Sequence, residues 1–188
     1  MCIRDRAQRH DLLDRISMQR MDYHHLETLP SNSYSGVYSM ESMAHASDPE
    51  TVAAGFYRVL KPGGRIVLHE HQNLLPGEKG MSRLGRKMVT GVYRNSAQVT
   101  GYAARPGFYK ELLEEAGFVD VVVRDYSENL RPMLRLFFGL AAVPWVFVEA
   151  FGVERLFVNT VAGVAVYVGR RYWRYVSVSG RKPGELVG

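Results

Sequence analysis

Cysteine is almost absent from this chain of 188 residues, in which Cys2 is the single one. One cysteine excludes an internal disulfide framework and a zinc site built on cysteine thiolates. The sequence also has no Asn-x-Ser/Thr acceptor for N-glycosylation, and its stretch from Cys2 to Arg20 is polar and charged, unlike a signal peptide. Together these absences favour a reducing environment, and we expect a cytoplasmic location.

A strong charge of one sign is missing as well. The 24 basic residues exceed the 19 acidic ones by only five, and 46% of all residues are hydrophobic. The small positive excess does not by itself indicate nucleic acid, and no nucleic-acid partner is expected. The composition is globular and the length suits one domain. We expect that domain to cover residues 9–182, with residues 1–8 and 183–188 as disordered tails.

The first half of the chain carries the signals of a parallel sheet. Residues 4–20 predict a short helix that runs into a strand at about residues 16–21, and residues 36–40 are typical of a buried strand. Asp48 and Pro49 suit the N-cap and first position of a helix, which the sequence Lys61–Gly64 should end. Residues 65–69 would then be the next strand, which completes a βαβ unit.

The second half of the chain adds a long connection and two more strands. Residues 72–104 are irregular and rich in Gly, Ser and Asn, and a connection of this length is typical of a lid. A helix is expected from Pro106 to Gly117. Strands are expected at residues 119–126 and 172–179, where apolar residues cluster or alternate.

An apolar insertion, residues 134–168, lies between those two strands within a helical segment predicted for residues 127–168. Its uncharged run at residues 136–148 is too short for the roughly 20 residues of a spanning helix, and Pro144 should interrupt it. Two interpretations remain open. The first is a pair of buried helices, and the second is an apolar substrate pocket or a membrane-contacting surface. Basic residues around the segment suit an anionic membrane. Peripheral attachment to an internal membrane such as the endoplasmic reticulum is therefore the alternative location.

Asp22 is the first candidate binding residue. It follows a predicted strand, and ligands of open parallel sheets bind outside the carboxyl ends of the strands. Its carboxylate would accept hydrogen bonds from a ligand. The alternative is an aspartate that only forms a turn.

Five motifs occur in an order that characterises one enzyme family. They are Asp22-Tyr23 with Leu29-Pro30, Val37–Glu41 with His45–Asp48, Leu60–Gly64, Tyr109–Phe118, and Phe157–Thr160 with Trp173–Tyr175. With these motifs the chain resembles a class I S-adenosylmethionine-dependent methyltransferase over roughly residues 9–182, and it looks most similar to the sterol C-24 methyltransferase type. The resemblance implies an α/β, Rossmann-like fold whose mostly parallel sheet has an antiparallel last strand.

The resemblance also implies S-adenosyl-L-methionine as the cofactor and assigns residues to it. Asp22 would face the adenine amino group, and the backbone N–H of Tyr23 would meet a ring nitrogen. Ser39 and Met40 would line the cofactor pocket, with plain strand packing as the alternative for both.

The chain departs from the family pattern at the glycine loop. The family carries a G-x-G sequence where the backbone approaches the methionine end of the cofactor, whereas no two glycines of this chain lie two apart. The acidic residue that holds the ribose hydroxyls has no candidate either. We therefore expect the carboxyl-terminal part of a longer enzyme, which alone binds the cofactor weakly or not at all.

Glu41 and His45 are the candidate catalytic residues. They are four apart, which places them on one face if the segment is helical. Methylation of an alkene carbon creates a carbocation, which needs a nearby carboxylate and later a base. Related cyclopropanating methyltransferases have a histidine at the position of His45. The alternatives are a packing or capping role for His45 and a solvated loop carboxylate for Glu41.

His69 and His71 share one face of their predicted strand. His71 is expected in the wall of the substrate site, with structural packing as the alternative. A third ligand is not evident in the sequence, so no metal is expected.

These residues predict methyl transfer from S-adenosylmethionine to an apolar small molecule that is sterol-like, a terpenoid or a lipid. The first alternative is O- or N-methylation of a secondary metabolite, with His45 or His71 as the base. The second is a non-catalytic lipid- or membrane-binding fragment. The expected partners are the apolar acceptor and a membrane surface.

Overall fold

The computed structural model describes residues 3–74, 83, 86, 90 and 106–184. Its long connection, where the sequence predicts a lid, lies almost entirely outside the described residues. The elements are α1 (Ile3–Arg9), β1 (Tyr34–Met40), η1 (Met43–His45), α2 (Pro49–Val59), β2 (Leu60–Asn73), α4 (Phe108–Glu115), β3 (Val119–Asp125), α5 (Ser127–Phe151), α6 (Val158–Val168) and β4 (Trp173–Arg181). Helix α1 includes residues expected to form a disordered tail.

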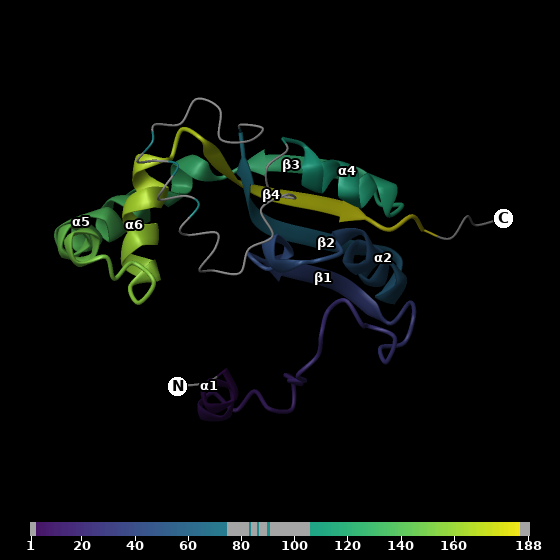
Figure 1. The fold of residues 1–188 in the computed structure, drawn as a ribbon. Coiled ribbons are helices and arrows are strands. Elements are labelled where there is room, and N and C mark those ends of the chain that lie inside the picture. The colour runs from purple at the N-terminus through teal and green to yellow at the C-terminus, as the bar shows by residue number, and fades with distance from the viewer. Residues whose placement is uncertain (1–2, 75–82, 84–85, 87–89, 91–105, 185–188) are drawn as a thin grey trace.

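The strands form one sheet in the order β1-β2-β4-β3 (Figure 1). β1 and β2 are parallel, whereas β4 is antiparallel to both of its neighbours. The last strand of the chain is thus inserted in the opposite direction, as the sequence predicts.

The βαβ unit forms as its local signals predict, but β1, expected to be a buried strand, is largely exposed, because it lies at the edge of the sheet. The Asp48 carboxylate accepts a hydrogen bond from the Thr51 N–H at 2.9 Å, and Pro49 occupies the first turn of α2. β2 is longer than the predicted residues 65–69, because the chain turns into the strand at Leu60, directly after α2. Gly64 has no room for a side chain there, since a Cβ would lie 2.8 Å from the Lys61 carbonyl oxygen.

The core lies between one face of the sheet and the helices α2 and α4. Ile66 and Leu68 of β2, Val178 of β4 and Leu113 of α4 meet there and are almost fully buried. Side chains of β2 alternate, so that Glu70 lies on this buried face, whereas His69 and His71 lie on the other. The core therefore fixes which side chains β2 presents at its carboxyl end.

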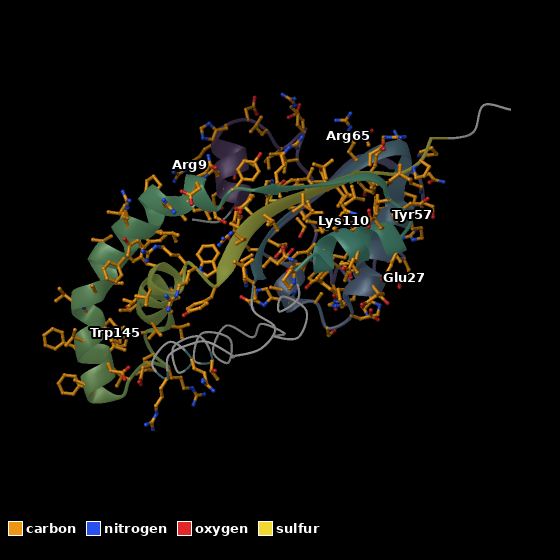
Figure 2. All side chains as sticks on the ribbon, turned by 90° about the horizontal axis from the view of Figure 1, so that it is seen from above. Arg9, Glu27, Tyr57, Arg65, Lys110 and Trp145 are labelled. Carbon is orange, nitrogen blue, oxygen red and sulfur yellow. The ribbon has the colours of Figure 1, made fainter. Side chains whose placement is uncertain are left out.

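Helices α5 and α6 extend beyond one end of the sheet and pack on each other (Figure 1). Phe138 stacks on Tyr167 with ring centroids 4.6 Å apart. Figure 2 shows α5, on which Trp145 is labelled, standing apart from the sheet. We call these two helices and their connection the helical arm.

Two sequence predictions about regular structure are wrong. Residues 16–21 form no strand, because no described strand pairs with them and an isolated strand leaves its hydrogen-bonding groups unpaired. Pro144 does not interrupt the apolar segment, since α5 continues through it for 25 residues. The missing N–H costs one hydrogen bond, and the turns on either side hold the helix together.

The expected pair of buried helices is not found for α5. Leu134 and Val148 are its buried residues, whereas Leu140 is 66% and Phe147 60% exposed. By length and composition α5 could cross a membrane, although the core helix of a soluble protein can pass the same test. The exposure of α5 therefore favours the other interpretation of this apolar segment, a substrate pocket or a membrane-contacting surface.

Candidate active site

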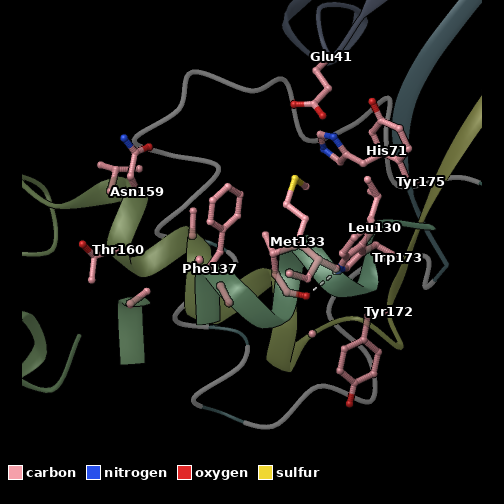
Figure 3. A pocket seen from close by; sticks show the side chains of 18 of the residues that line it. Glu41, His71, Leu130, Met133, Phe137, Asn159, Thr160, Tyr172, Trp173 and Tyr175 are labelled. Atoms are coloured by element: carbon pink, nitrogen blue, oxygen red, sulfur yellow. Dashed lines mark hydrogen bonds between the residues drawn. The ribbon is translucent and has the colours of Figure 1, made fainter. Parts of the chain in front are cut away.

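A pocket of about 850 Å³ lies between the helical arm and the carboxyl end of β2 (Figure 3). Its walls are mostly apolar side chains of the arm, among them Leu130, Met133 and Phe137, and the arm also contributes the polar Asn159 and Thr160. Glu41, His71 and Tyr175 gather at its other end. We call these three residues the polar end. An apolar cavity with a few convergent polar groups is the usual form of a small-molecule site.

The polar end is assembled by three strands. His71 of β2 and Tyr175 of β4 are direct partners across the antiparallel ladder. Glu41 follows β1, and its backbone N–H donates to the His69 carbonyl at 2.8 Å. The expected pocket wall at His71 and the expected catalytic Glu41 thus lie together.

Tyr175 was missed by the sequence reasoning. Its phenol lies at the same end of the pocket as the Glu41 carboxylate, and burial, followed by the negative charge of Glu41 and the hydrogen-bonding effect of its side chain, raises the pKa of Tyr175 to about 12. The phenol therefore keeps its proton at neutral pH. The signal in the sequence was the alternating strand pattern, but only the sheet register shows which residue faces His71.

The second missed residue is Glu70, whose side chain is fully buried. Its Oε1 accepts hydrogen bonds from the backbone N–H groups of Ser42 at 3.1 Å and Met43 at 3.0 Å. Burial raises the pKa of Glu70, although these hydrogen bonds act in the opposite direction. The available signal was that Glu70 continues the alternation of Ile66 and Leu68, which places a carboxylate on the apolar face of the strand, and a buried carboxylate needs partners.

Glu70 holds the turn that follows β1. The Ser42 carbonyl accepts a hydrogen bond from the Tyr23 phenol at 3.1 Å, and the hydroxyl groups of Ser39 and Ser42 are hydrogen-bonded. Glu41 has a φ of 51°, a left-handed conformation that costs a non-glycine residue energy unless its surroundings hold it. These contacts fix the position from which Glu41 faces the pocket.

The sequence-based link between Glu41 and His45 does not hold. Glu41 precedes the short helix η1 in a left-handed conformation, so the two side chains do not share a helical face. His45 is exposed and is not among the described residues that line the pocket. The catalytic roles of both residues stay predictions.

Asp22 and Tyr23 lie in the loop before β1. The Asp22 carboxylate accepts a hydrogen bond from the His24 N–H at 2.9 Å, and this bond and the His24 side chain lower the pKa of Asp22. Asp22 is exposed and ionised, so it is able to accept hydrogen bonds from an amino group. Met40 ends β1 and is also exposed, whereas Ser39 is buried. Within the described residues no group of three or more His, Cys, Asp or Glu side chains could hold a metal ion.

Comparisons with known proteins show which domains and enzymes this chain is similar to. A family model described as a methyltransferase domain matches residues 1–68. The chain is 43% identical over 172 residues to the S-adenosyl-L-methionine-dependent Diels-Alderase iccD of Talaromyces variabilis, covering 90% of this chain and 59% of that protein. It is 35% identical over 109 residues to the Diels-Alderase iliD of Neonectria sp. (strain DH2), covering 56% and 39%. The chain thus spans about six tenths or less of these relatives.

Solved structures show the same fold. The crystal structure of the 4+2 cyclase SpnF has a TM-score of 0.67 at 23% identity, covering 96% of this chain and 61% of that one. Geranyl diphosphate methyltransferase in complex with S-adenosylmethionine has a TM-score of 0.68 at 16% identity, covering 95% and 62%. The chain has the α/β fold of class I S-adenosylmethionine-dependent methyltransferases, as the sequence predicts.

The comparisons also bear on the cofactor and the expected branch. S-adenosyl-L-methionine, the expected cofactor, is confirmed as that of this type of domain. The ionised Asp22 fits its adenine amino group, whereas the sequence holds no G-x-G for its methionine end. The likeness to the sterol C-24 type is weak: sterol 24-C-methyltransferase erg6 of Aspergillus fumigatus matches over 64 residues, 34% of this chain and 17% of that protein, at 38% identity.

Proposed function

We propose that this chain provides the substrate pocket of an S-adenosylmethionine-dependent enzyme that acts on an elongated apolar small molecule. The observation that carries the proposal is the pocket of about 850 Å³, whose walls are mostly apolar and whose polar end holds Glu41, His71 and Tyr175. The pocket adjoins the carboxyl ends of the strands, where sheets of this type bind their ligands. Asp22, Tyr23, Ser39 and Met40 would bind the cofactor on the other side of the Glu41 turn.

We further propose that the reaction is a Diels-Alder-type ring closure. The support is the 43% identity to a Diels-Alderase over nearly the whole chain. In such a reaction the three π bonds of a diene and an alkene become two new carbon–carbon σ bonds and one new π bond, and no atom or electron is transferred to the protein. The walls of the pocket would hold a flexible substrate in its folded, reactive conformation, which lowers the entropic part of the barrier.

Methyl transfer to a terpenoid, sterol-like or other lipid acceptor is the second candidate. The methyltransferase domain match and the fold shared with geranyl diphosphate methyltransferase favour it. The cofactor would supply the methyl group in this case. Glu41 would stabilise a carbocation next to the pocket, whereas in O- or N-methylation His71 would accept the acceptor's proton.

A product analysis separates the two reactions. The substrate is a linear 1,3-diene tethered to an unsaturated carbonyl group, incubated with S-adenosylmethionine and either the chain alone or the chain joined to the amino-terminal part of iccD. Ring closure leaves the product's mass unchanged and produces no S-adenosylhomocysteine. Methyl transfer adds one methyl group and releases one S-adenosylhomocysteine per product. If both protein forms bind the substrate but yield neither product, the proposed reactions are wrong.

We also propose that the exposed side of α5 contacts a membrane, so that the enzyme acts in the cytoplasm at a membrane surface. The exposed apolar residues of α5 and the arginines that follow it support this placement. Without catalysis, the same surface would serve a lipid-binding fragment.

A further inference from the structure

The pocket has two chemically different parts. The six residues that α5 contributes to it are all apolar: Leu130, Met133, Leu134, Phe137, Leu140 and Ala141. The polar end lies opposite, where Glu41, His71 and Tyr175 come from three different strand ends. Asn159 and Thr160 of α6 add polar groups away from the polar end, but they carry no charge. The Glu41 carboxylate is therefore the charged group that a ligand meets beside the apolar wall of α5.

The polar end is rich in hydrogen-bond acceptors. The Glu41 carboxylate has only acceptor atoms, and the phenol oxygen of Tyr175 at the same end also has lone pairs. His71 beside them can donate or accept, according to its tautomer. No lysine or arginine occurs among the described residues that line the pocket, so neither neutralises the charge of Glu41, and this carboxylate attracts hydrogen-bond donors.

These acceptors are held in place before any ligand arrives. The Glu41 N–H is fixed to the His69 carbonyl, and the two following N–H groups are fixed to the buried Glu70. On the other side, the Tyr175 N–H donates to the Ser127 hydroxyl at 2.9 Å and the Tyr126 N–H donates to the Tyr175 carbonyl at 2.8 Å. Hydrogen bonds thus connect the start of α5 to the polar end. Because these groups are already fixed, binding of a ligand loses less conformational entropy.

From this arrangement we propose that the pocket selects an amphiphile whose head group donates a hydrogen bond, through N–H or O–H, to the Glu41–Tyr175 pair. The proposal rests on the proposed function, because it names the substrate class of the same apolar pocket. Glu41 would accept the head-group proton, Tyr175 would orient the carboxylate, and the apolar chain would lie along α5 and α6.

The test uses four probes of equal chain length below their micellar concentrations: decan-1-ol, decylamine, methyl decanoate and decanoate. Trp173 lines the pocket and Trp145 lies on α5, and the chain has only these two tryptophans, so their fluorescence reports binding. We expect decan-1-ol and decylamine to bind about tenfold more tightly than the ester, in line with one hydrogen bond to a charged group. Decanoate should bind most weakly.

Two variants complete the test. Glu41→Gln should sharply reduce the preference for decylamine over methyl decanoate, because the amide carries no negative charge for the ammonium group, while the affinity for the ester stays within about twofold. Glu154→Gln, which removes a carboxylate from the connection between α5 and α6, should keep the preference. Circular dichroism of each variant confirms that it is folded.

The outcomes separate this proposal from the proposed function. Equal binding of all four probes, or a preference that survives Glu41→Gln, overturns the head-group assignment but leaves an apolar pocket. If none of the four probes binds to the folded chain, both proposals fail.

Discussion

The sheet region and the helical arm use similar apolar residues in opposite ways. In the sheet region, Leu68 and Leu113 are completely buried between β2 and the helices α2 and α4. In the arm, Leu140 and Phe147 are largely exposed although they belong to a 25-residue helix. The first region supplies stability, whereas the second leaves apolar surface exposed, which we propose contacts a substrate or a membrane. Apolar content alone therefore does not distinguish a core from a binding surface.

The largest expected difference between the regions is in the free energy of unfolding. Leu113→Ala should lower it by about 3 kcal/mol, because the truncation leaves a cavity in a fully packed core. Leu140→Ala, the same chemical change on the exposed side of α5, should lower it by less than about 0.5 kcal/mol. Urea denaturation of both variants measures the difference, and similar losses would show that α5 is buried in solution.

A second prediction concerns the buried carboxylate that joins the core to the site. Glu70→Ala should lower the free energy of unfolding by about 2 kcal/mol, since two buried N–H groups lose their acceptor. Glu70→Gln should cost less, because its amide oxygen still accepts hydrogen bonds. Urea denaturation at constant pH compares the three proteins, and an Ala variant as stable as the wild type would contradict the contacts.

The pH dependence of the same position has a definite sign. Burial raises the pKa of Glu70 in the folded state, so the folded protein holds this proton more tightly than the unfolded chain. The contribution of Glu70 to stability is therefore complete below its unfolded pKa and decreases as pH rises through the folded one. The stability of Glu70→Gln relative to the wild type should therefore increase as pH rises through this range. A decrease would show that folding lowers the pKa of Glu70 instead of raising it.

The arm gives a smaller effect, but it tests the proposed membrane contact. Phe147→Ser should weaken binding to phosphatidylserine-containing vesicles about tenfold, because a large apolar side chain no longer enters the interface. Tyr38→Ser, at an exposed aromatic residue of β1, is the matched control and should change little. Vesicle flotation measures both. Retention of the chain in membranes after alkaline carbonate extraction would indicate a spanning α5 instead.

The smallest expected effect is at a helix end in the sheet region. Asp48→Ala should lower the free energy of unfolding by about 1 kcal/mol, because the Thr51 N–H loses its cap. Asp48→Asn should recover most of the loss, since its side chain still caps the helix. Thermal unfolding detects the difference, and an unchanged midpoint for Asp48→Ala would show that the cap contributes nothing.

Local signals made most of the fold predictable from the sequence. The Asp48 cap, the alternation in β4 and the glycine after α4 act on neighbouring residues, so the elements that they mark are found close to the predicted positions. Residues 16–21 were wrongly predicted as a strand, because strand formation depends on a partner that the pattern does not contain. The exposure of α5 was also not determined locally, since an apolar segment looks the same whether or not something covers it.

The candidate site was less predictable for the same reason. Glu41 and His71 were identified by their residue types near strand ends, and both line the pocket. Tyr175 and Glu70 were missed, because the interactions that give them importance join residues far apart in the sequence. Such contacts follow from sheet register and burial, which a single sequence does not specify.

The unequal lengths of β1 and β2 give the sheet a step. β1 pairs with β2 as far as Met40 and His69, whereas β2 continues to Asn73 along β4. The chain leaves the ladder at Glu41 without disturbing the pairing of the longer strands. Substitutions or insertions in the turn after Met40 can therefore change the shape of the pocket entrance while the pairing of β2 with β4 stays intact. Changes at this step are thus a way to adapt the pocket to ligands of different length.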